Sequence, residues 1–206
     1  MHWLSLWVST FSLVFAIIDP FGFVPVFLAM TASDTEGRRR EMLKIACVTA
    51  FAVLAFFTFT GRGLLSFFGI SIPALQISGG LILIVISFEM LKVIPVKEKL
   101  SQSEEDEAVA KEDISIVPLA IPMLSGPASI TTVVVLISKQ HTVANYLIVL
   151  SSVAATLVIT YLVLRSANRV FRFIGITGLN VLTRVMGLLL CAVAVQFVIN
   201  GYLAVR

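Results

Sequence analysis

The sequence predicts an all-α integral membrane protein with six transmembrane helices forming a single transmembrane domain over residues 1–206. Of its 206 residues, 58% are hydrophobic and only 13% are charged, whereas about a quarter of a soluble domain is charged. The charged residues also gather in short clusters between apolar runs of membrane-spanning length. Mean hydropathy is +1.02. This composition leaves no room for a soluble catalytic domain, so we do not expect an enzyme.

Six apolar runs define the expected spans, and all should be helices because lipid offers the backbone no hydrogen-bond partners. The first run is expected to stay in the mature protein, because it lacks the basic start and small-residue cleavage site of a signal peptide. Residues 32–43 are expected to be a loop, and residues 165–180, with arginines at helical spacing, to lie along the membrane interface. The spans cover residues 4–31, 44–61, 73–92, 114–137, 144–164 and 181–203, approximately.

Basic residues are distributed unevenly between the two sides of the expected spans. Of the fifteen Lys and Arg residues, only Arg62, Lys139 and Arg206 fall in one set of alternating loops. The other set holds the remaining twelve, and the positive-inside rule places that set in the cytoplasm. Both chain termini are then expected outside, and the acidic linker 93–113 inside.

The two halves of the chain resemble each other. The pair Pro20 and Pro25 recurs as Pro122 and Pro127, "FFGIS" (67–71) as "FIGIT" (173–177), and "QISGGLIL" (76–83) more loosely as "RVMGLLLC" (184–191). Each half, residues 1–92 and 114–206, would hold three spans. Because three is odd, the second half must enter the membrane from the opposite side, which predicts the inverted repeat common in secondary transporters.

The first span of each half should be broken. Proline removes a backbone donor and clashes with the preceding helical turn, and the first span contains "DPFGFVP" (19–25). The fourth carries prolines at 118, 122 and 127 beside Gly126. Paired interrupted spans at equivalent positions indicate a transporter's binding site.

The residues at the breaks suggest what such a site would hold. Ser125 or Gly126 can cap a half-helix that begins at Pro127, whose N–H groups would suit an anionic group such as a carboxylate. The half-helix ending near Ile18 exposes carbonyls, and Asp19 adds a carboxylate there, so a cationic group such as an ammonium would suit that end. Together they match a small zwitterion. The expected substrate-binding residues are Asp19, Pro20, Gly22, Pro25, Ser125, Gly126, Pro127, Ala128 and Ser129.

Plainer interpretations exist for the same residues. The prolines can be simple kinks, and Asp19-Pro20 can be an N-cap followed by the first residue of a half-helix. A carboxylate inside a membrane is nonetheless functional by default. Gly79, Gly80 and Gly187 are expected to mediate helix packing. Gln196 and Asn200 are expected to form hydrogen bonds between helices. No metal site is expected.

At these residues the sequence resembles the MarC family of bacterial and archaeal inner-membrane proteins, which includes SnatA-type transporters of small neutral amino acids. The blocks that carry the resemblance are "IIDPFGFVPVFLAMT", "FGISIPALQISGGLIL", "IVPLAIPMLSGPASITTVVVL" and "RVMGLLLCAVAVQFVINGY". The resemblance implies six helices in an inverted repeat with discontinuous first and fourth helices. It also implies transport of glycine, alanine or similar amino acids coupled to a cation such as H⁺ or Na⁺, without a cofactor. The family usually has Gly-Pro-Gly where this chain has Gly126-Pro127-Ala128, which bears on the exact substrate.

Two other functions compete with the transporter hypothesis. Aquaporin-like channels also use inverted repeats with half-helices, but here the breaks fall in the first span of each repeat and no Asn-Pro-Ala pair is present. A membrane enzyme would need a metal cluster or a nucleophile–base pair, and neither is visible in the sequence. The expected partners are a small neutral amino acid and the lipid bilayer, with no nucleic acid, and the oligomeric state is open.

Overall fold

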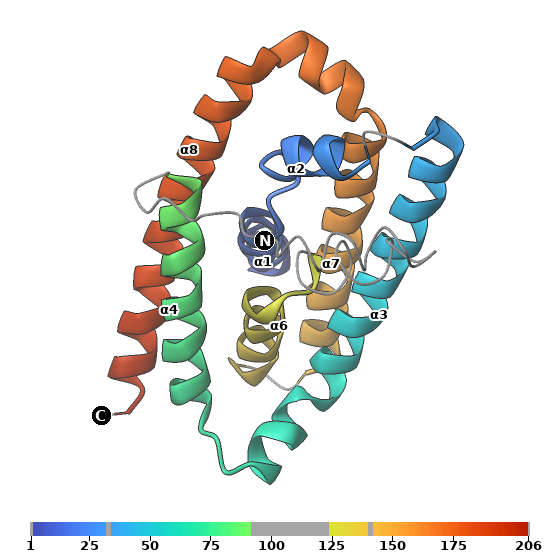
Figure 1. Cartoon of the computed structure of the whole chain (residues 1–206). Helices are drawn as coiled ribbons and strands as arrows, with labels where there is room; N and C mark the ends of the chain where they lie inside the picture. Colours follow the sequence, from blue (N-terminus) through green and yellow to red (C-terminus); the bar gives the residue numbers. More distant parts are fainter. Residues whose placement is uncertain (1, 32–33, 92–123, 140–141, 206) are drawn as a thin grey trace.

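The structure is a computed structural model that describes residues 2–31, 34–91, 124–139 and 142–205 (Figure 1). Within these residues every regular element is a helix, which confirms the all-α prediction. The first half of the fourth expected span, residues 114–123, and the acidic linker lie outside the described residues. The helices are α1 (His2–Ile18), α2 (Phe23–Met30), α3 (Glu36–Phe67), α4 (Ile72–Met90), α6 (Pro127–Lys139), α7 (Val143–Arg165) and α8 (Ala167–Leu203).

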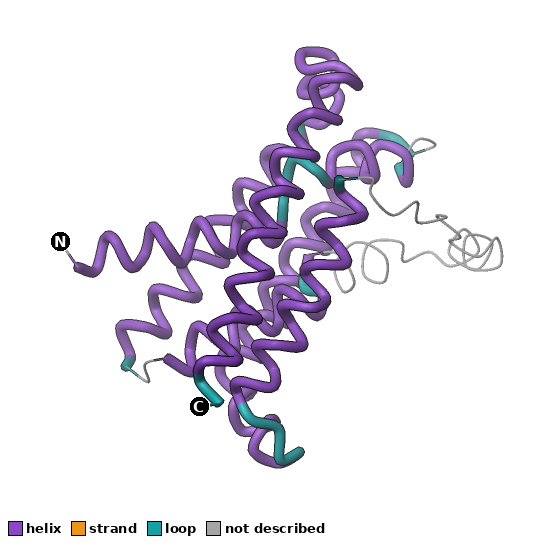
Figure 2. Tube along the Cα trace, turned by 90° about the vertical axis from the view of Figure 1, so that its left-hand side faces the viewer, coloured by secondary structure: helices purple, strands orange, loops and turns teal. Residues whose placement is uncertain are grey.

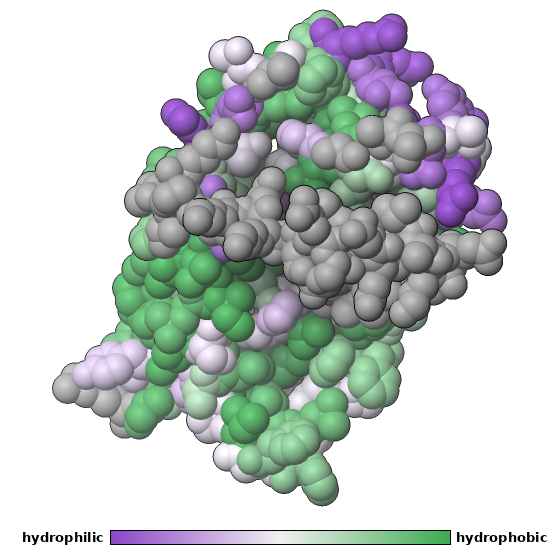
Figure 3. All heavy atoms as spheres, in the orientation of Figure 1, coloured by the Kyte–Doolittle hydropathy of each residue, from purple (hydrophilic) through white to green (hydrophobic). Residues whose placement is uncertain are grey.

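Four helical segments are long and apolar enough to cross a membrane: α3, α4, α7 and the Thr177–Leu203 part of α8. Two shorter apolar helices, Trp3–Ile18 and Pro127–Ser138, accompany them. Large apolar side chains such as Phe56, Leu147 and Leu188 are exposed on the outer surface. Figure 3 shows hydrophobic residues over much of this surface. A surface of this kind suits lipid, because lipid tails solvate apolar side chains as well as a protein core does.

The long helices form two antiparallel pairs, α3 with α7 and α4 with α8, and α1 and α6 lie between the pairs (Figure 1). Phe59 near the end of α3 stacks on Tyr146 near the start of α7, with ring centroids 5.5 Å apart. The indole Nε1 of Trp7 in α1 donates a hydrogen bond to Ser151 Oγ in α7 at 3.0 Å. Figure 2 shows the helix that starts at the N-terminus running at a steep angle to the long helices.

Glycines let the helices of the α4–α8 pair approach closely. A Cβ atom on Gly80 would lie 2.8 Å from the carbonyl oxygen of Ala194, and one on Gly187 would lie 2.9 Å from Met90 Cβ. A Cβ atom on Gly79 would collide with Thr131 of α6. The predicted packing role of these three glycines is therefore confirmed.

Two sequence-based expectations about the helices are wrong. Residues 36–43 are not a loop but the first turns of α3, because Thr35 caps the helix by accepting a hydrogen bond from Arg38 N at 3.4 Å, and the following Arg, Glu, Met and Leu residues favour helix. The second concerns Gln196 and Asn200, whose side chains bond to each other within α8 at 2.8 Å instead of joining two helices. They lie four residues apart, so they are neighbours on one helix surface.

The glycines of the matched motifs "FFGIS" and "FIGIT" share a positive φ. Gly69 has φ 67° and Gly175 has φ 68°, values that glycine adopts without steric cost. Gly69 lies just after α3 ends, whereas Gly175 bends α8 before its membrane-spanning part begins. Each glycine therefore precedes the last apolar helix of its half of the chain.

Candidate functional site

The first break lies between α1 and α2 and is centred on Asp19. The amide of Asp19 donates a hydrogen bond to Phe15 O at 2.9 Å, which completes α1, and its carbonyl accepts one from Phe23 N at 3.3 Å, where α2 begins. Its φ of 42° lies in the left-handed region, which Asp and Asn tolerate better than most residues. The predicted interruption is therefore present, and residues 19–22 are not helical.

The carboxylate of Asp19 turns back over the break. Its Oδ1 accepts a hydrogen bond from Gly22 N at 3.2 Å, and only 8% of the residue is exposed. A Cβ atom on Gly22 would collide with Oδ2, so a residue with a side chain cannot replace this glycine while the carboxylate keeps its place. Within the described part of the chain, Oδ2 has no hydrogen-bond partner. The capping interpretation of Asp19 thus has a structural counterpart in one oxygen, whereas the other oxygen is available to a ligand.

The second break expected from the sequence falls where α6 begins, and the chain before Leu124 lies outside the described residues. Ser125 and Gly126 are non-helical, and the carbonyl of Gly126 accepts the first intrahelical hydrogen bond from Ile130 N at 3.0 Å. Gly126 therefore occupies the N-cap and Pro127 the first helical position, where proline loses no helical hydrogen bond. The amides of the first turn have no intrahelical acceptor. Ser125 is 1% exposed and Gly126 is also buried, so this helix start lies inside the protein.

The two breaks lie close together in the centre of the molecule. Ile17 and Ile18 at the end of α1 line the same small cavity as Ser129 and Thr132 of α6, with Leu54 of α3 on another side. The cavity holds no space for a water-sized sphere. The end of α1 and the start of α6 are therefore packed against each other, with no room for a water molecule between these residues.

Not all expected site residues face this centre. Asp19, Pro20, Ser125, Gly126, Ala128 and Ser129 are buried and Gly22 is half-buried, but Pro25 and Pro127 are exposed. Pro25 lies in the first turn of α2 and Pro127 starts α6. These two prolines lie at the helix starts, and their exposure distinguishes them from the buried residues of the expected site.

Sequence reasoning missed a polar face on α7. Ser152, Thr156 and Thr160 are fully buried, and each threonine hydroxyl donates to the carbonyl four residues earlier. The hydroxyl of Ser152 has no hydrogen-bond partner among the described atoms. The spacing of four residues was a usable signal, since residues four apart share one helix face.

The two breaks offer opposite polarities inside the protein. The end of α1 contributes carbonyl oxygens and Oδ2 of Asp19, which attract a cation, whereas the start of α6 contributes amides and the positive end of a helix dipole, which attract an anion. Among the described residues no three His, Cys, Asp or Glu side chains are placed to hold a metal ion. The chemistry that these groups support directly is the binding of a small molecule with both charges.

Comparison with known proteins places this architecture in a sequence family. The family described as "MarC family integral membrane protein" matches residues 4–205. A UPF0056 membrane protein of Methanocaldococcus jannaschii is 38% identical over 198 residues, which covers 96% of each chain. One from Aquifex aeolicus is 34% identical and covers 95% of this chain and 92% of its own. The UPF0056 membrane protein YhcE of Escherichia coli K12 is 31% identical, over 91% of this chain and 87% of its own. No solved structure gave a significant match.

Proposed function

This chain belongs to the MarC family of integral membrane proteins, and from that premise we propose that it is a secondary active transporter of small neutral amino acids. Its substrates would be of the glycine, alanine and serine type, and their movement would be coupled to a cation, H⁺ or Na⁺. The observation that carries the proposal is the meeting of the interruption between α1 and α2, which holds the carboxylate of Asp19, with the buried start of α6. The resemblance of the two break motifs to SnatA-type transporters points the same way.

The charges at the two breaks select for a zwitterion. The substrate ammonium, or the coupling cation, would lie against Oδ2 of Asp19 and the carbonyls at the end of α1, and the carboxylate would lie against the amides at the start of α6. The described residues at the two breaks include no arginine or lysine. A substrate side chain with its own negative charge would find no partner there, which favours an uncharged one.

The tight packing between the breaks selects for small size. The cavity shared by Ile18 and Ser129 has no room for a water-sized sphere, so a substrate must separate α1 from α6 when it enters. Ser129 and Thr132 contribute the polar groups of the cavity's lining. Ala128, which stands where the family usually has glycine, adds a methyl group beside Ser129. A closed site between two broken helices is the arrangement that alternating access requires, because each side must open in turn.

The two halves of the chain support such a movement if they are inverted copies. Two inverted repeats of three spans, residues 1–92 and 114–206, would produce similar φ values at Gly69 and Gly175, as found here. They would also produce the antiparallel pairing of α3 with α7 and of α4 with α8. In this proposal the arginine-rich end faces the cytoplasm and both termini lie outside. The membrane is the inner or cell membrane of a bacterium or archaeon.

The test is uptake by purified protein in liposomes, with labelled glycine, alanine and serine under sodium or proton gradients. Asp19→Asn should abolish uptake or its ion dependence with thermal stability little changed, because asparagine caps a helix almost as well and also tolerates a positive φ. Glu89→Gln, an exposed acid-to-amide change at the end of α4, is the matched control and should transport normally.

Two results would contradict the proposal. Uptake by Asp19→Asn with unaltered affinity and ion dependence would leave Asp19 as a helix cap only. Uptake that does not saturate and shows no counterflow would favour the aquaporin-like channel instead, since a channel has no occluded, substrate-bound state.

A further inference from the structure

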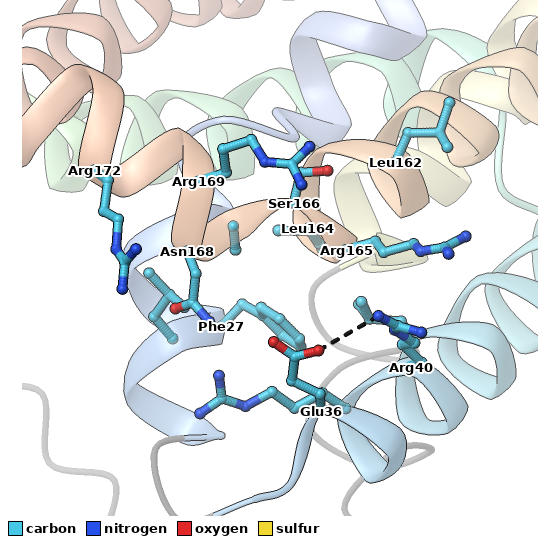
Figure 4. A pocket seen from close by; sticks show the side chains of 14 residues that line it. Phe27, Glu36, Arg40, Leu162, Leu164, Arg165, Ser166, Asn168, Arg169 and Arg172 are labelled. Carbon is cyan, nitrogen blue, oxygen red and sulfur yellow. Dashed lines mark hydrogen bonds and ion pairs between the residues drawn. The ribbon is translucent and has the colours of Figure 1, made fainter.

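A cavity of about 590 Å³ lies away from the helix breaks, where the start of α3 meets the end of α7 (Figure 4). Figure 3 shows hydrophilic residues gathered at this end of the molecule. Five arginines line the cavity, from the first turns of α3 and from both sides of the junction between α7 and α8. They are Arg39, Arg40, Arg165, Arg169 and Arg172.

Among the described residues that line this cavity, the basic side chains outnumber the acidic ones. Glu36 is the acid in its lining, and it pairs with Arg40 at 3.4 Å. Arg39 Nε donates a hydrogen bond to the carbonyl of Thr31 at 2.8 Å, which holds its guanidinium beside the cavity. The guanidinium groups of Arg165, Arg169 and Arg172 form no ion pair with any described residue. A cavity lined by several guanidinium groups is a favourable binding site for a phosphate, because arginine binds phosphate through pairs of parallel hydrogen bonds.

An apolar groove of about 380 Å³ lies next to the arginine cavity, on the outer surface between α3 and α7. Its floor and walls include Val48, Phe51 and Val158, which are 68%, 37% and 58% exposed. Lys44 and Tyr161 line one end. Each is one helical turn, roughly 6 Å, from an arginine of the cavity, Arg40 on α3 and Arg165 on α7. The groove therefore continues from the arginine cavity into the surface that faces lipid.

We propose that the arginine cavity and this groove together bind one anionic phospholipid of the surrounding membrane. The phosphate would lie among the arginines, and an acyl chain would lie in the groove between α3 and α7. A soluble phosphate would use the arginines but would leave the groove empty. A neutral phospholipid would fill the groove but would leave the excess positive charge unmatched. The site is separate from the helix breaks, so the inference does not depend on the proposed function.

The experiment measures lipid binding to the full-length protein in detergent, by native mass spectrometry and by thermal shift. Dioleoyl phosphatidylglycerol and dioleoyl phosphatidylcholine are titrated in parallel, because they share acyl chains and differ in net charge. Phosphatidylglycerol should bind more tightly, and its advantage should shrink as salt is added. Equal binding of the two lipids would overturn the proposal.

Variants separate the head-group contacts from the groove. The triple variant Arg165→Gln, Arg169→Gln, Arg172→Gln should lose the preference for phosphatidylglycerol by on the order of 100-fold, since each arginine near an anionic membrane contributes roughly a factor of five. Arg184→Gln, an exposed arginine outside the cavity, is the matched control and should keep it. An unchanged preference in the triple variant would refute the assignment of the arginines.

Two further measurements test the groove and the source of the phosphate. Val158→Trp places a bulky side chain in the groove, so it should weaken binding of dioleoyl phosphatidylglycerol and leave the weak binding of inorganic phosphate unchanged. If inorganic phosphate alone reproduces the full thermal shift, or if Val158→Trp binds the lipid normally, the occupant is a soluble anion and the lipid proposal is wrong. The comparison of the two lipids on the unmodified protein decides the question even where a variant fails to fold.

Discussion

Replacing Gly22 by alanine should disturb the protein through a single neighbour, the Asp19 side chain. The added methyl group would collide with Oδ2 and lie 2.9 Å from Cγ of Asp19. Backbone atoms are not in the way, so the strain falls on the carboxylate, which must rotate away from the break. The change therefore tests whether the observed position of the carboxylate matters to stability.

The expected cost follows from the contacts that the rotation breaks. Loss of the hydrogen bond from Gly22 N to Oδ1 costs about 1.5–3 kcal/mol for a charged acceptor. Holding the side chain off its preferred rotamer adds about 0.5–1.5 kcal/mol. Replacing glycine by alanine also stabilises the folded protein by about 0.4–1 kcal/mol, because it lowers the conformational entropy of the unfolded chain. The net destabilisation should be about 1–4 kcal/mol by these values.

A double-mutant cycle with Asp19→Gly isolates this interaction, because glycine accepts the positive φ and removes the carboxylate. Equilibrium unfolding in mixed micelles gives the four stabilities. In the Asp19→Gly background, Gly22→Ala should be neutral or slightly stabilising. Gly63→Ala is the control for a glycine substitution alone, because a Cβ atom added at Gly63 would have no neighbour within 4 Å. Equal destabilisation by Gly22→Ala in both backgrounds would refute the reasoning.

Two other predictions test the packing and the topology. Gly80→Ala should destabilise the protein by about 1–3 kcal/mol, because the added Cβ would lie 2.8 Å from the carbonyl oxygen of Ala194. The measurement is the same equilibrium unfolding in mixed micelles. If Gly80→Ala is as stable as Gly63→Ala, the close approach of α4 and α8 is contradicted. For topology, single cysteines at the exposed residues Asn168 and Ser66, in a background without the native cysteines, should react with a membrane-impermeant reagent from opposite sides. Labelling of Asn168 from outside intact cells would reverse the proposed orientation.

The sequence was sufficient to predict the helical class and the place of the first break. Apolar runs of spanning length have no stable alternative to helix in lipid, and "DPFGFVP" concentrates proline and glycine where α1 ends at Ile18. Helix ends were harder to predict. Residues 32–43 were expected to be a loop, but helix α3 extends beyond its apolar part to the Thr35 cap. Hydrophobicity predicts which part of a helix lies in the membrane, not where the helix ends.

Tertiary neighbours could not be predicted from the sequence. The arginines of α3 and those near the α7–α8 junction are more than a hundred residues apart, so their spacing indicated a side of the membrane but not a shared cavity. Likewise, nothing in the chain around Gly22 revealed that the carboxylate of Asp19 lies over it. Both facts depend on the folded backbone. Pro25 and Pro127 are exposed, so a sequence motif can indicate where a helix begins without predicting which of its residues are buried.

The capping role of Asp19 does not by itself explain why the residue is an acid. Asparagine would cap almost as well and also tolerates the left-handed backbone. It would avoid the cost of a carboxylate deep in the membrane, about 2.5–3.5 kcal/mol on insertion scales. Only 8% of Asp19 is exposed, so its carboxylate is largely withdrawn from any surrounding solvent. Its Oδ1 is used by Gly22 N, and that bond offsets part of the cost. Under the proposed function, a cation at Oδ2 would offset the rest of the cost, and Asp19→Asn should then spare the fold and abolish transport.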